Sequence, residues 1–181
     1  MTFSETSIAG AWLVGLEPRS DERGFFARVW CEEAFAAHGL TTRFVQCNDG
    51  YSRRAGTLRG LHYQADPHGE VKFVRCIRGA VFDVIVDLRE DSPSYLQWFG
   101  LELSADSRQM LYVPSGCAHG YQTLLDDSEV LYPVSAPYTP AAERGVRWND
   151  PLFAIRWPEV SERHVSAKDE AWADYVPGRR A

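Results

Sequence analysis

The segment from Ala80 to Leu88 most constrains the fold of this chain, because its side chains alternate in character with a period of two. One face carries Phe82, Val84, Val86 and Leu88, and the other carries Val81, Asp83, Ile85 and Asp87. Successive side chains of a β-strand point to opposite faces, so this pattern predicts a strand with one half-polar face.

Further strands are predicted at Gln97–Leu103, Met110–Val113 and Glu129–Val134. Turn-forming clusters at residues 89–93 and 125–128 separate them. Many short strands at this spacing are typical of an antiparallel sandwich or barrel.

Helix signals are few. Cys31–His38, followed by Gly39, is the best early helix, and a second short helix is predicted near Ala167–Ala173. We therefore expect one all-β domain over residues 1–181, an antiparallel β-barrel with small helical additions and short terminal extensions.

Composition narrows the class of protein. Of the 181 residues, 45% are hydrophobic and 13% aromatic, which is typical of a globular chain with a substantial core. No apolar run is long enough to cross a membrane, and the first residues lack a secretory signal, so we expect a cytoplasmic protein. The net charge of −6 argues against a nucleic-acid partner. Four scattered cysteines predict reduced packing residues.

An anionic ligand would need a local basic cluster. The candidates are Arg23, Arg53, Arg54, Arg59, Lys72 and Lys168. Most lysines and arginines are solvated surface charges. Arg59 and Lys72 differ, because alternation is expected to place them near His62 on neighbouring strands.

Two histidine motifs indicate chemistry. Arg59-Gly-Leu-His-Tyr-Gln64 resembles the opening motif of a cupin barrel, in which His-x-His usually binds a metal, but Gln64 occupies the second histidine position. Pro114-Ser-Gly-Cys-Ala-His-Gly120 matches the other cupin motif. A zinc or iron site needs three or four ligands, and only His62, His119 and Glu70 or Asp83 are available. The pattern therefore favours metal-free acid–base chemistry over a metal-dependent cupin such as a dioxygenase.

The chain as a whole resembles the dTDP-4-dehydrorhamnose 3,5-epimerases, which are metal-free cupins of deoxysugar nucleotide pathways. The resemblance runs in order from about residue 20 to 170. It is carried by residues 21–26, 44–48, 58–64, 72–75, 79–84, 86–89, 92–93, 113–120, 148–151, 155–158 and 166–169, together with Tyr132, Tyr138 and Glu143.

The resemblance implies a role for each site residue. His62 would be the base that removes the proton beside the C4 ketone, Asp169 its orienting carboxylate, Lys72 the cation for the enolate, and Tyr132 the acid on the opposite face. The substrate-binding residues would be Arg59, His119, Glu143, Lys168, Tyr138, Gln46 and Asn48. Arg23 and Phe26 would come from a neighbouring subunit of a homodimer with shared sites.

The scheme is chemically sound without the family. A carbonyl makes adjacent protons removable, and inversion needs a base on one face and an acid on the other. Positioned proton transfer contributes about 10²–10⁴ in rate, and a cation near the enolate adds electrostatic stabilisation. No cofactor is required.

The chain also departs from the family pattern. Arg28 stands where a carboxylate is usual, Glu70 where Gln is common, and Pro133 where Lys is common. If residue 28 contacts the nucleobase, a carboxylate there can accept a hydrogen bond from the N3–H of thymine. An arginine instead donates hydrogen bonds to the acceptor atoms of cytosine or guanine. We therefore hypothesise that the nucleotide is CDP or GDP rather than dTDP. Two further alternatives are an epimerase that inverts a single carbon and a non-catalytic cupin that only binds the sugar.

Overall fold

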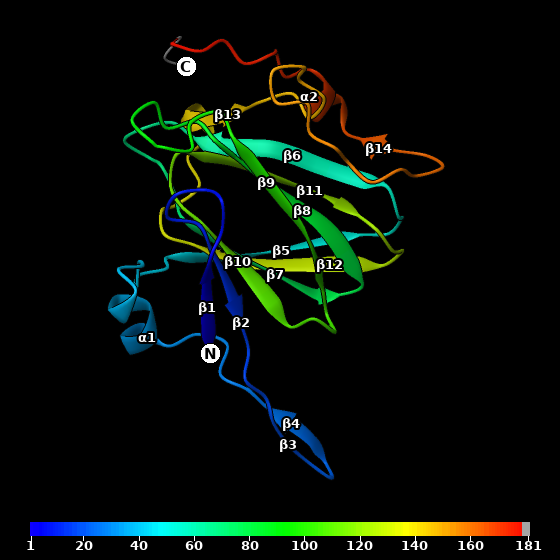
Figure 1. Cartoon of the computed structure of the whole chain (residues 1–181). Coiled ribbons are helices and arrows are strands. Elements are labelled where there is room, and N and C mark those ends of the chain that lie inside the picture. Colours follow the sequence, from blue (N-terminus) through cyan, green and yellow to red (C-terminus); the bar gives the residue numbers. More distant parts are fainter. Residues whose placement is uncertain (179–181) are drawn as a thin grey trace.

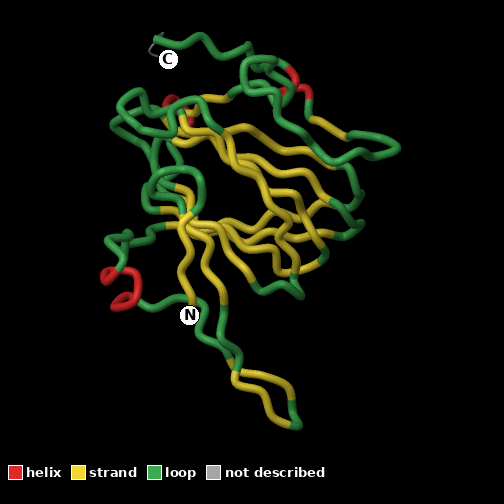
Figure 2. The backbone as a smooth tube through the Cα atoms, in the orientation of Figure 1, coloured by secondary structure: helices red, strands yellow, loops and turns green. Residues whose placement is uncertain are grey.

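Two β-sheets that face each other form the body of the computed structural model, which describes residues 1–178 (Figures 1 and 2). The first, here the β7 sheet, has the order β1 (Thr2–Glu5), β2 (Trp12–Gly15), β10 (Gln109–Val113), β7 (Lys72–Arg78), β12 (Ser128–Val134) and β5 (Gln46–Ser52). The second, the β6 sheet, has the order β13 (Glu143–Gly145), β6 (Thr57–Gln64), β11 (Cys117–Thr123), β8 (Ala80–Asp87) and β9 (Trp98–Ser104). Both are antiparallel along these orders, and β14 (His164–Val165) pairs in parallel with β6.

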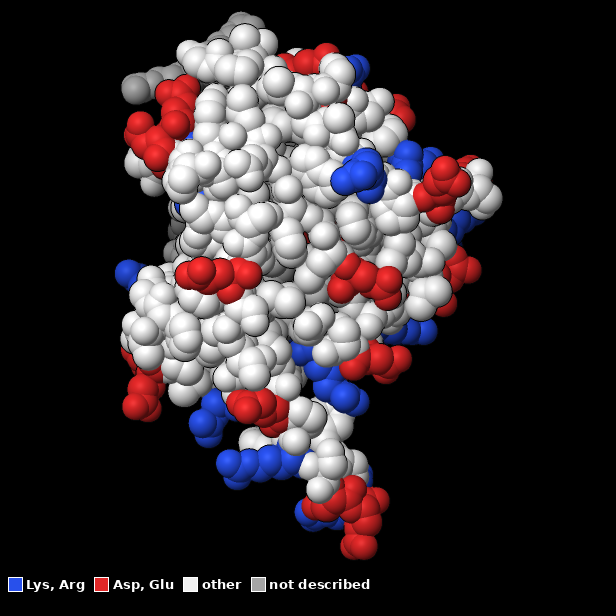
Figure 3. Space-filling model, in the orientation of Figure 1, with Lys and Arg blue, Asp and Glu red and all other residues white. Residues whose placement is uncertain are grey.

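A hairpin of β3 (Arg19–Asp21) and β4 (Gly24–Phe26) projects from the body as a separate arm (Figure 1). Charged side chains of both signs cover its tip (Figure 3). Phe26 lies on this arm with 71% of its surface exposed. Phe25, the residue before it, is also half-exposed, at 50%.

The expected strands are confirmed, with ends shifted by one residue. The early helix is also confirmed as α1 (Glu32–Ala37), and Gly39 follows it with φ +69°. The second helix was predicted too long. It is α2 (Ala167–Glu170), a single turn, because Trp172 leaves the helical path and packs against Gly145 and the edge of the His62 ring. A 3₁₀ turn, η1 (Pro140–Ala142), completes the helical additions.

The half-polar strand predicted over Ala80–Leu88 is confirmed as β8, and the structure adds that both of its faces are covered. Asp83 and Asp87 are both 0% exposed. Val81 and Ile85, on the same face, pack in the core between the sheets, while Val84 and Val86 pack on the opposite face. The acidic face is buried because it points into a barrel interior where each carboxylate has a basic partner, His119 for Asp83 and Arg89 for Asp87.

Three apolar clusters stabilise the layers. The central one fills part of the barrel interior and includes Val74, Ile85 and Leu111. The second packs α1 onto the outer face of the β7 sheet through Phe35 and Phe73. The third lies on the outer face of the β6 sheet, beneath the chain that follows β13, and its members are Leu61, Val84, Val86, Ala118, Val146 and Phe153. The rest of the barrel interior is left for polar side chains.

Within residues 1–178, no helix combines the length and the apolar character that crossing a bilayer requires. The cytoplasmic location expected from the sequence stays a prediction.

Candidate active site

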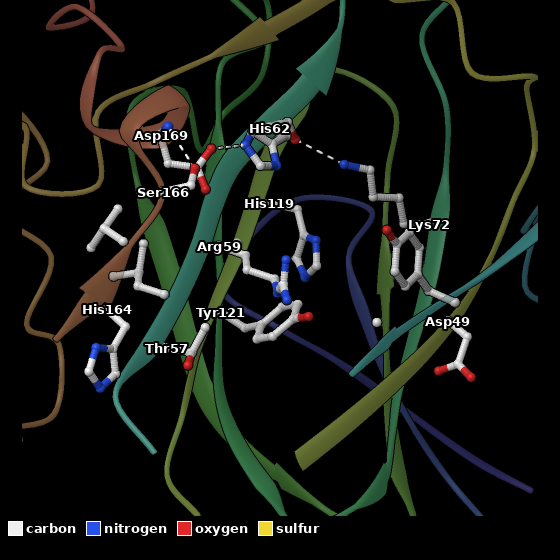
Figure 4. A pocket seen from close by; sticks show the side chains of 15 residues that line it. Asp49, Thr57, Arg59, His62, Lys72, His119, Tyr121, His164, Ser166 and Asp169 are labelled. Carbon is white, nitrogen blue, oxygen red and sulfur yellow. Dashed lines mark hydrogen bonds and ion pairs between the residues drawn. The ribbon is translucent and has the colours of Figure 1, made fainter. Parts of the chain in front are cut away.

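A cavity of about 540 Å³ lies between the two sheets (Figure 4). Its walls come from six strands, β5, β6, β7, β11, β12 and β14, and from α2 with its capping residue Ser166. The lining side chains with polar chemistry are Asp49, Thr57, Arg59, His62, Lys72, His119, Tyr121, Tyr132, His164, Ser166 and Asp169. Six of the residues singled out from the sequence therefore share one cavity: Arg59, His62, Lys72, His119, Tyr132 and Asp169.

His62 and Asp169 form a hydrogen-bonded pair at the cavity wall. The Nε2–H of His62 donates to Asp169 Oδ1 at 2.7 Å. Asp169 is held in turn, because its backbone N–H donates to the capping hydroxyl of Ser166 at 3.1 Å and its Oδ2 accepts from Gly60 N–H at 3.4 Å. Burial alone would raise the pKa of Asp169, but the hydrogen bond from His62, the charge of that ring when protonated, and the hydrogen bonds with Gly60 and Ser166 together lower it. The carboxylate is thus kept ionised as an acceptor for the imidazole.

Lys72 approaches His62 from the other sheet. Its Nζ donates to the backbone carbonyl of His62 at 2.9 Å and lies 3.3 Å from Glu70 Oε1. Figure 4 shows Asp169 and Lys72 on either side of His62. Arg59 and Lys72 line the same cavity as His62, as expected, but they do not come from strands that neighbour its own: Arg59 shares β6 with His62, and Lys72 begins β7 in the facing sheet. Alternation fixes the face of a strand but not its partner across the barrel.

A second histidine–aspartate pair lies beside the first. His119 Nε2 lies 3.0 and 2.9 Å from the two oxygens of Asp83. His119 pairs in register with His62 across β11 and β6. The two strands approach unusually closely next to this pair, because a Cβ on Gly60 would lie 2.5 Å from Gly120 Cα. Gly60 also has φ +129°, a conformation that favours glycine.

Two tyrosines complete the central cavity, the buried Tyr121 and the half-buried Tyr132. Tyr132 comes from β12, and burial raises the pKa of its phenol, with the Glu70 charge adding to the rise and the Arg59 charge opposing it. Burial also raises the pKa of Tyr121 to about 12. Both phenols therefore hold their protons firmly at neutral pH.

A smaller cavity of about 140 Å³ adjoins the first and shares His62, Lys72 and Tyr132 with it. Its other walls include Asn48, Gln64, Glu70, Tyr138 and Glu143. Glu143 accepts a hydrogen bond from Tyr138 Oη at 2.7 Å and one from Lys168 Nζ at 2.6 Å. Burial would raise the pKa of Glu143, but the hydrogen bonds from Lys168 and Tyr138 lower it, so its carboxylate stays ionised.

Gln64 has a bracing role that explains its place in the first histidine motif. Its amide Nε2 donates to the carbonyls of His68 at 2.9 Å and Pro137 at 3.2 Å, and its Oε1 accepts from Thr139 N–H at 2.6 Å. The amide therefore anchors the loop that carries Tyr138. Within the described residues, no group of three or more His, Cys, Asp and Glu side chains is arranged to hold a metal.

The remaining predicted residues lie at different distances from the cavity. Arg59 is fixed by Ser52 Oγ and the Tyr51 carbonyl at 3.2 and 3.0 Å. Gln46 accepts from Tyr138 N–H at 2.6 Å. Arg23, Phe26 and Arg28 are exposed residues of the hairpin arm and the chain just after it, outside both cavities of the same chain.

Sequence reasoning missed Tyr121, Ser166 and the pairing roles of Asp83 and Glu70. Tyr121 follows His119 at a spacing of two, so strand alternation could have placed it on the same face. Ser166 stands three residues before Asp169, which is the spacing of a helix cap. The pairs of Asp83 and Glu70 depend on the closure of the barrel, which no local signal encodes.

Comparisons with known proteins show which family the chain resembles. A family model described as dTDP-4-dehydrorhamnose 3,5-epimerase matches residues 5–176. An enzyme of that name from Sinorhizobium fredii is 42% identical over 171 residues, covering 94% of this chain and 88% of the relative.

Solved structures extend the agreement to the fold. The dTDP-4-dehydrorhamnose 3,5-epimerase of Bacillus anthracis, with TDP and PPi bound, has a TM-score of 0.92 at 41% identity and covers 96% of this chain and 99% of its own. A 3'-monoepimerase from Streptomyces bikiniensis, in complex with dTDP-quinovose, has a TM-score of 0.87 at 35% identity and covers 93% and 85%. The expected cupin-type barrel is thereby confirmed. Taken with the family match over residues 5–176, these similarities show that the chain belongs to the dTDP-4-dehydrorhamnose 3,5-epimerase family.

Proposed function

We propose that this protein is an isomerase that inverts C3 and C5 of dTDP-4-dehydro-6-deoxyglucose and so forms dTDP-4-dehydrorhamnose, a step of deoxysugar biosynthesis. One observation carries the proposal. The hydrogen-bonded His62–Asp169 pair, the ammonium of Lys72 and the phenol of Tyr132 line one cavity of a chain that belongs to this family.

His62 acts as the base. Because its Nε2–H donates to Asp169, the lone pair of its Nδ1 is available to take a proton. The proton removed is the one on the carbon next to the C4 ketone, and the electron pair of that C–H bond moves to the ketone oxygen as an enolate. Lys72, held beside His62, stabilises the negative oxygen in a site partly shielded from water.

Tyr132 acts as the acid. It comes from the sheet that faces β6, so it can deliver a proton to the face of the enolate opposite His62. Because burial raises the pKa of this phenol, it keeps its proton until the enolate takes it. Protonation on the second face collapses the enolate to the ketone and leaves the carbon inverted, with no need for a cofactor.

The nucleotide sugar is bound by the polar walls of the two cavities. Arg59 and Lys168 supply positive charge for the diphosphate, and His119, Glu143 and Asn48 supply hydrogen bonds. Tyr138 stacks on the substrate, and Gln46 fixes the backbone of Tyr138. That relatives bind TDP and dTDP-quinovose supports a dTDP-linked substrate.

A homodimer with shared sites accounts for the hairpin arm. Phe26 and Arg23 are exposed at a distance from the cavities of their own chain, and Phe25 and Trp30 nearby are 50% and 40% exposed. We place this arm over the site of a second copy, where Phe26 and Arg23 would contact the nucleotide. Sedimentation at micromolar concentration should give twice the chain mass, and a monomer that retains full activity would contradict the arrangement.

Arg28 supports a second candidate substrate. It lies at the base of the arm beside Phe26, in a groove of about 420 Å³. If the arm reaches a nucleobase, Arg28 favours a base that presents acceptors, as cytosine and guanine do. A CDP- or GDP-linked 4-keto sugar, inverted at one or both centres, is therefore the alternative. The monoepimerase among the similar structures supports the single-centre variant.

Proton NMR in D₂O tests these proposals directly. The purified enzyme is given dTDP-, CDP- and GDP-4-keto-6-deoxyglucose, and the C3 and C5 signals are followed. We expect deuterium at both carbons with the dTDP sugar. Deuterium at one carbon would show a monoepimerase, a preference for CDP or GDP would assign that role to Arg28, and no exchange with any of them would refute an epimerase.

Tyr132→Phe should separate exchange from inversion. His62 still removes and returns the proton on one face, so deuterium should enter the recovered substrate while inversion slows by about 10²-fold or more. Tyr95→Phe, which removes a hydroxyl paired with Tyr175, is the matched control and should leave both rates unchanged. Equal losses of exchange and inversion in Tyr132→Phe would contradict its assignment as the acid of the second face.

A further inference from the structure

Glu70 is a buried acid beside Lys72 to which the proposed mechanism gives no role. The two residues are two apart in an extended segment, so their side chains point to the same side, into the barrel. Val71 between them is fixed to Ser135, the residue after β12, because its N–H donates to Ser135 Oγ at 2.8 Å and its carbonyl accepts from Ser135 N–H at 3.0 Å. These bonds hold the backbone between Glu70 and Lys72 in place beside the end of β12.

The contact between Glu70 and Lys72 is largely shielded from solvent. Glu70 Oε1 lies 3.3 Å from Lys72 Nζ, and the two side chains are 8% and 10% exposed. The second oxygen, Oε2, is buried and has no hydrogen-bond partner among residues 1–178. Because no other donor there competes for the carboxylate, its charge acts on Lys72. Glu70 also lines the smaller cavity with His62 and Tyr132, so it belongs to the reaction chamber rather than to a remote brace.

We infer that Glu70 is a positioning residue for the reaction: its carboxylate keeps the Lys72 side chain protonated and directed at the cavity, and so sets the alkaline limit of activity. The inference deepens the proposed function and rests on it, since a protonated Lys72 matters because it must stabilise an enolate. A neutral amine would offer the enolate no positive charge.

The surrounding charges explain why Lys72 needs this partner. Burial lowers the pKa of Lys72, and the charges of Glu70, Asp83 and Glu143 oppose that shift, with Glu70 the strongest of the three. Asp83 on β8 is hydrogen-bonded to His119 of β11. Glu143 on β13 is paired with Lys168 and Tyr138.

Two further carboxylates line the same cavity, Asp49 on β5 and Asp169 in α2, and Asp169 is hydrogen-bonded to His62. The remaining neighbours of the ammonium carry no negative charge at neutral pH. His62 on β6 offers its backbone carbonyl, Tyr132 on β12 is a protonated phenol, and Arg59 on β6 carries positive charge. Glu70 is thus the carboxylate in direct contact with Nζ. Its removal should shift the proton affinity of Lys72 the most.

The pH dependence of kcat tests the inference through Glu70→Gln, which keeps the size of the side chain and removes its charge. An opposite charge at contact distance shifts a pKa by about one unit or more, so the alkaline limb should move to lower pH by about that amount. At pH values above the alkaline limb of the kcat profile, the variant should be about tenfold slower than wild type, and kcat at acidic pH should change little. A uniform loss of kcat at every pH, with the limb unmoved, would show a merely structural role and overturn the inference.

Two further variants test whether the charge of Glu70 is the cause of the shift. Glu70→Asp keeps the carboxylate, so it should restore the alkaline limb towards that of wild type even if its maximal rate is lower. Glu102→Gln removes an exposed carboxylate from β9 and should match wild type. If Glu70→Asp moved the limb as far as Glu70→Gln, charge could not be the cause.

The titration of Lys72 can also be measured by NMR in the absence of substrate. The chain has two lysines, Lys72 and Lys168, so protein labelled with ¹³C at lysine Cε gives two signals, and Lys168→Arg assigns them. We expect the Lys72 signal to titrate at lower pH in Glu70→Gln while the exposed Lys168 stays unchanged. An unmoved Lys72 titration would overturn the inference even in an active epimerase. A shifted titration in a protein that inverts no sugar would refute the proposed function alone.

Discussion

His62→Asn should lower kcat/KM by about 10²–10⁴, the usual contribution of a positioned general base. An asparagine amide cannot accept a proton at neutral pH, and its shorter side chain does not reach the Nε2 position that contacts Asp169, so both the base and its orienting contact are lost. The measurement is the initial rate of deuterium incorporation from D₂O at C3 and C5.

Binding separates a chemical defect from a structural one. dTDP affinity by calorimetry should stay close to that of wild type, because His62 is assigned to the sugar rather than to the nucleotide. His38→Asn alters a histidine at the end of α1 and should retain full activity. Near-normal exchange in His62→Asn would show that a different residue is the base.

Asp87→Asn should destabilise the fold by about 3–5 kcal/mol, the cost of breaking a buried ion pair on one side. Asp87 is 0% exposed and accepts two hydrogen bonds from the Arg89 guanidinium, both at 2.8 Å. It also accepts from the hydroxyls of Ser92 and Ser94. The same cluster also contacts the N-terminal part of the chain, because the Arg89 guanidinium donates a hydrogen bond to the carbonyl of Ala9 at 2.6 Å.

Urea unfolding at neutral pH measures this loss as a shift of the midpoint. Asp91→Asn removes an exposed carboxylate from the adjacent turn and serves as the matched control. An Asp87→Asn protein as stable as that control would mean that the cluster contributes little net stability.

The same carboxylate should make the fold sensitive to acid. Burial would raise the pKa of Asp87, but hydrogen bonds from Arg89, Ser92 and Ser94 outweigh it and lower the pKa from 3.8 to about 2. A folded-state pKa below the unfolded value stabilises the protein above about pH 4, and that stability is lost as pH falls towards 2. The difference in unfolding free energy between wild type and Asp87→Asn should therefore shrink over this range, by roughly 2 kcal/mol.

The sequence predicted the strands and their faces well, because side-chain alternation is a local property. Residues 80–88 indicate a strand by themselves. The ordered resemblance from residue 20 to 170 indicated the family, and with it which residues to look for. Local pattern could not show that both faces of β8 are covered, because the covering layer comes from residues far along the chain, such as Phe153.

The sequence alone thus indicated the all-β class, the family and the residues proposed for catalysis, including His62, Lys72 and Tyr132. The tertiary structure decided how they meet. Pairing of β6 with β11 sets the two histidines side by side, and closure of the sheets brings Lys72 across to the His62 carbonyl. It also buries Glu70 against Lys72 with one oxygen unpaired among the described residues. The physical reason is that alternation fixes only the side to which a residue points, whereas its partner is fixed by long-range strand pairing and by the desolvation that barrel closure imposes.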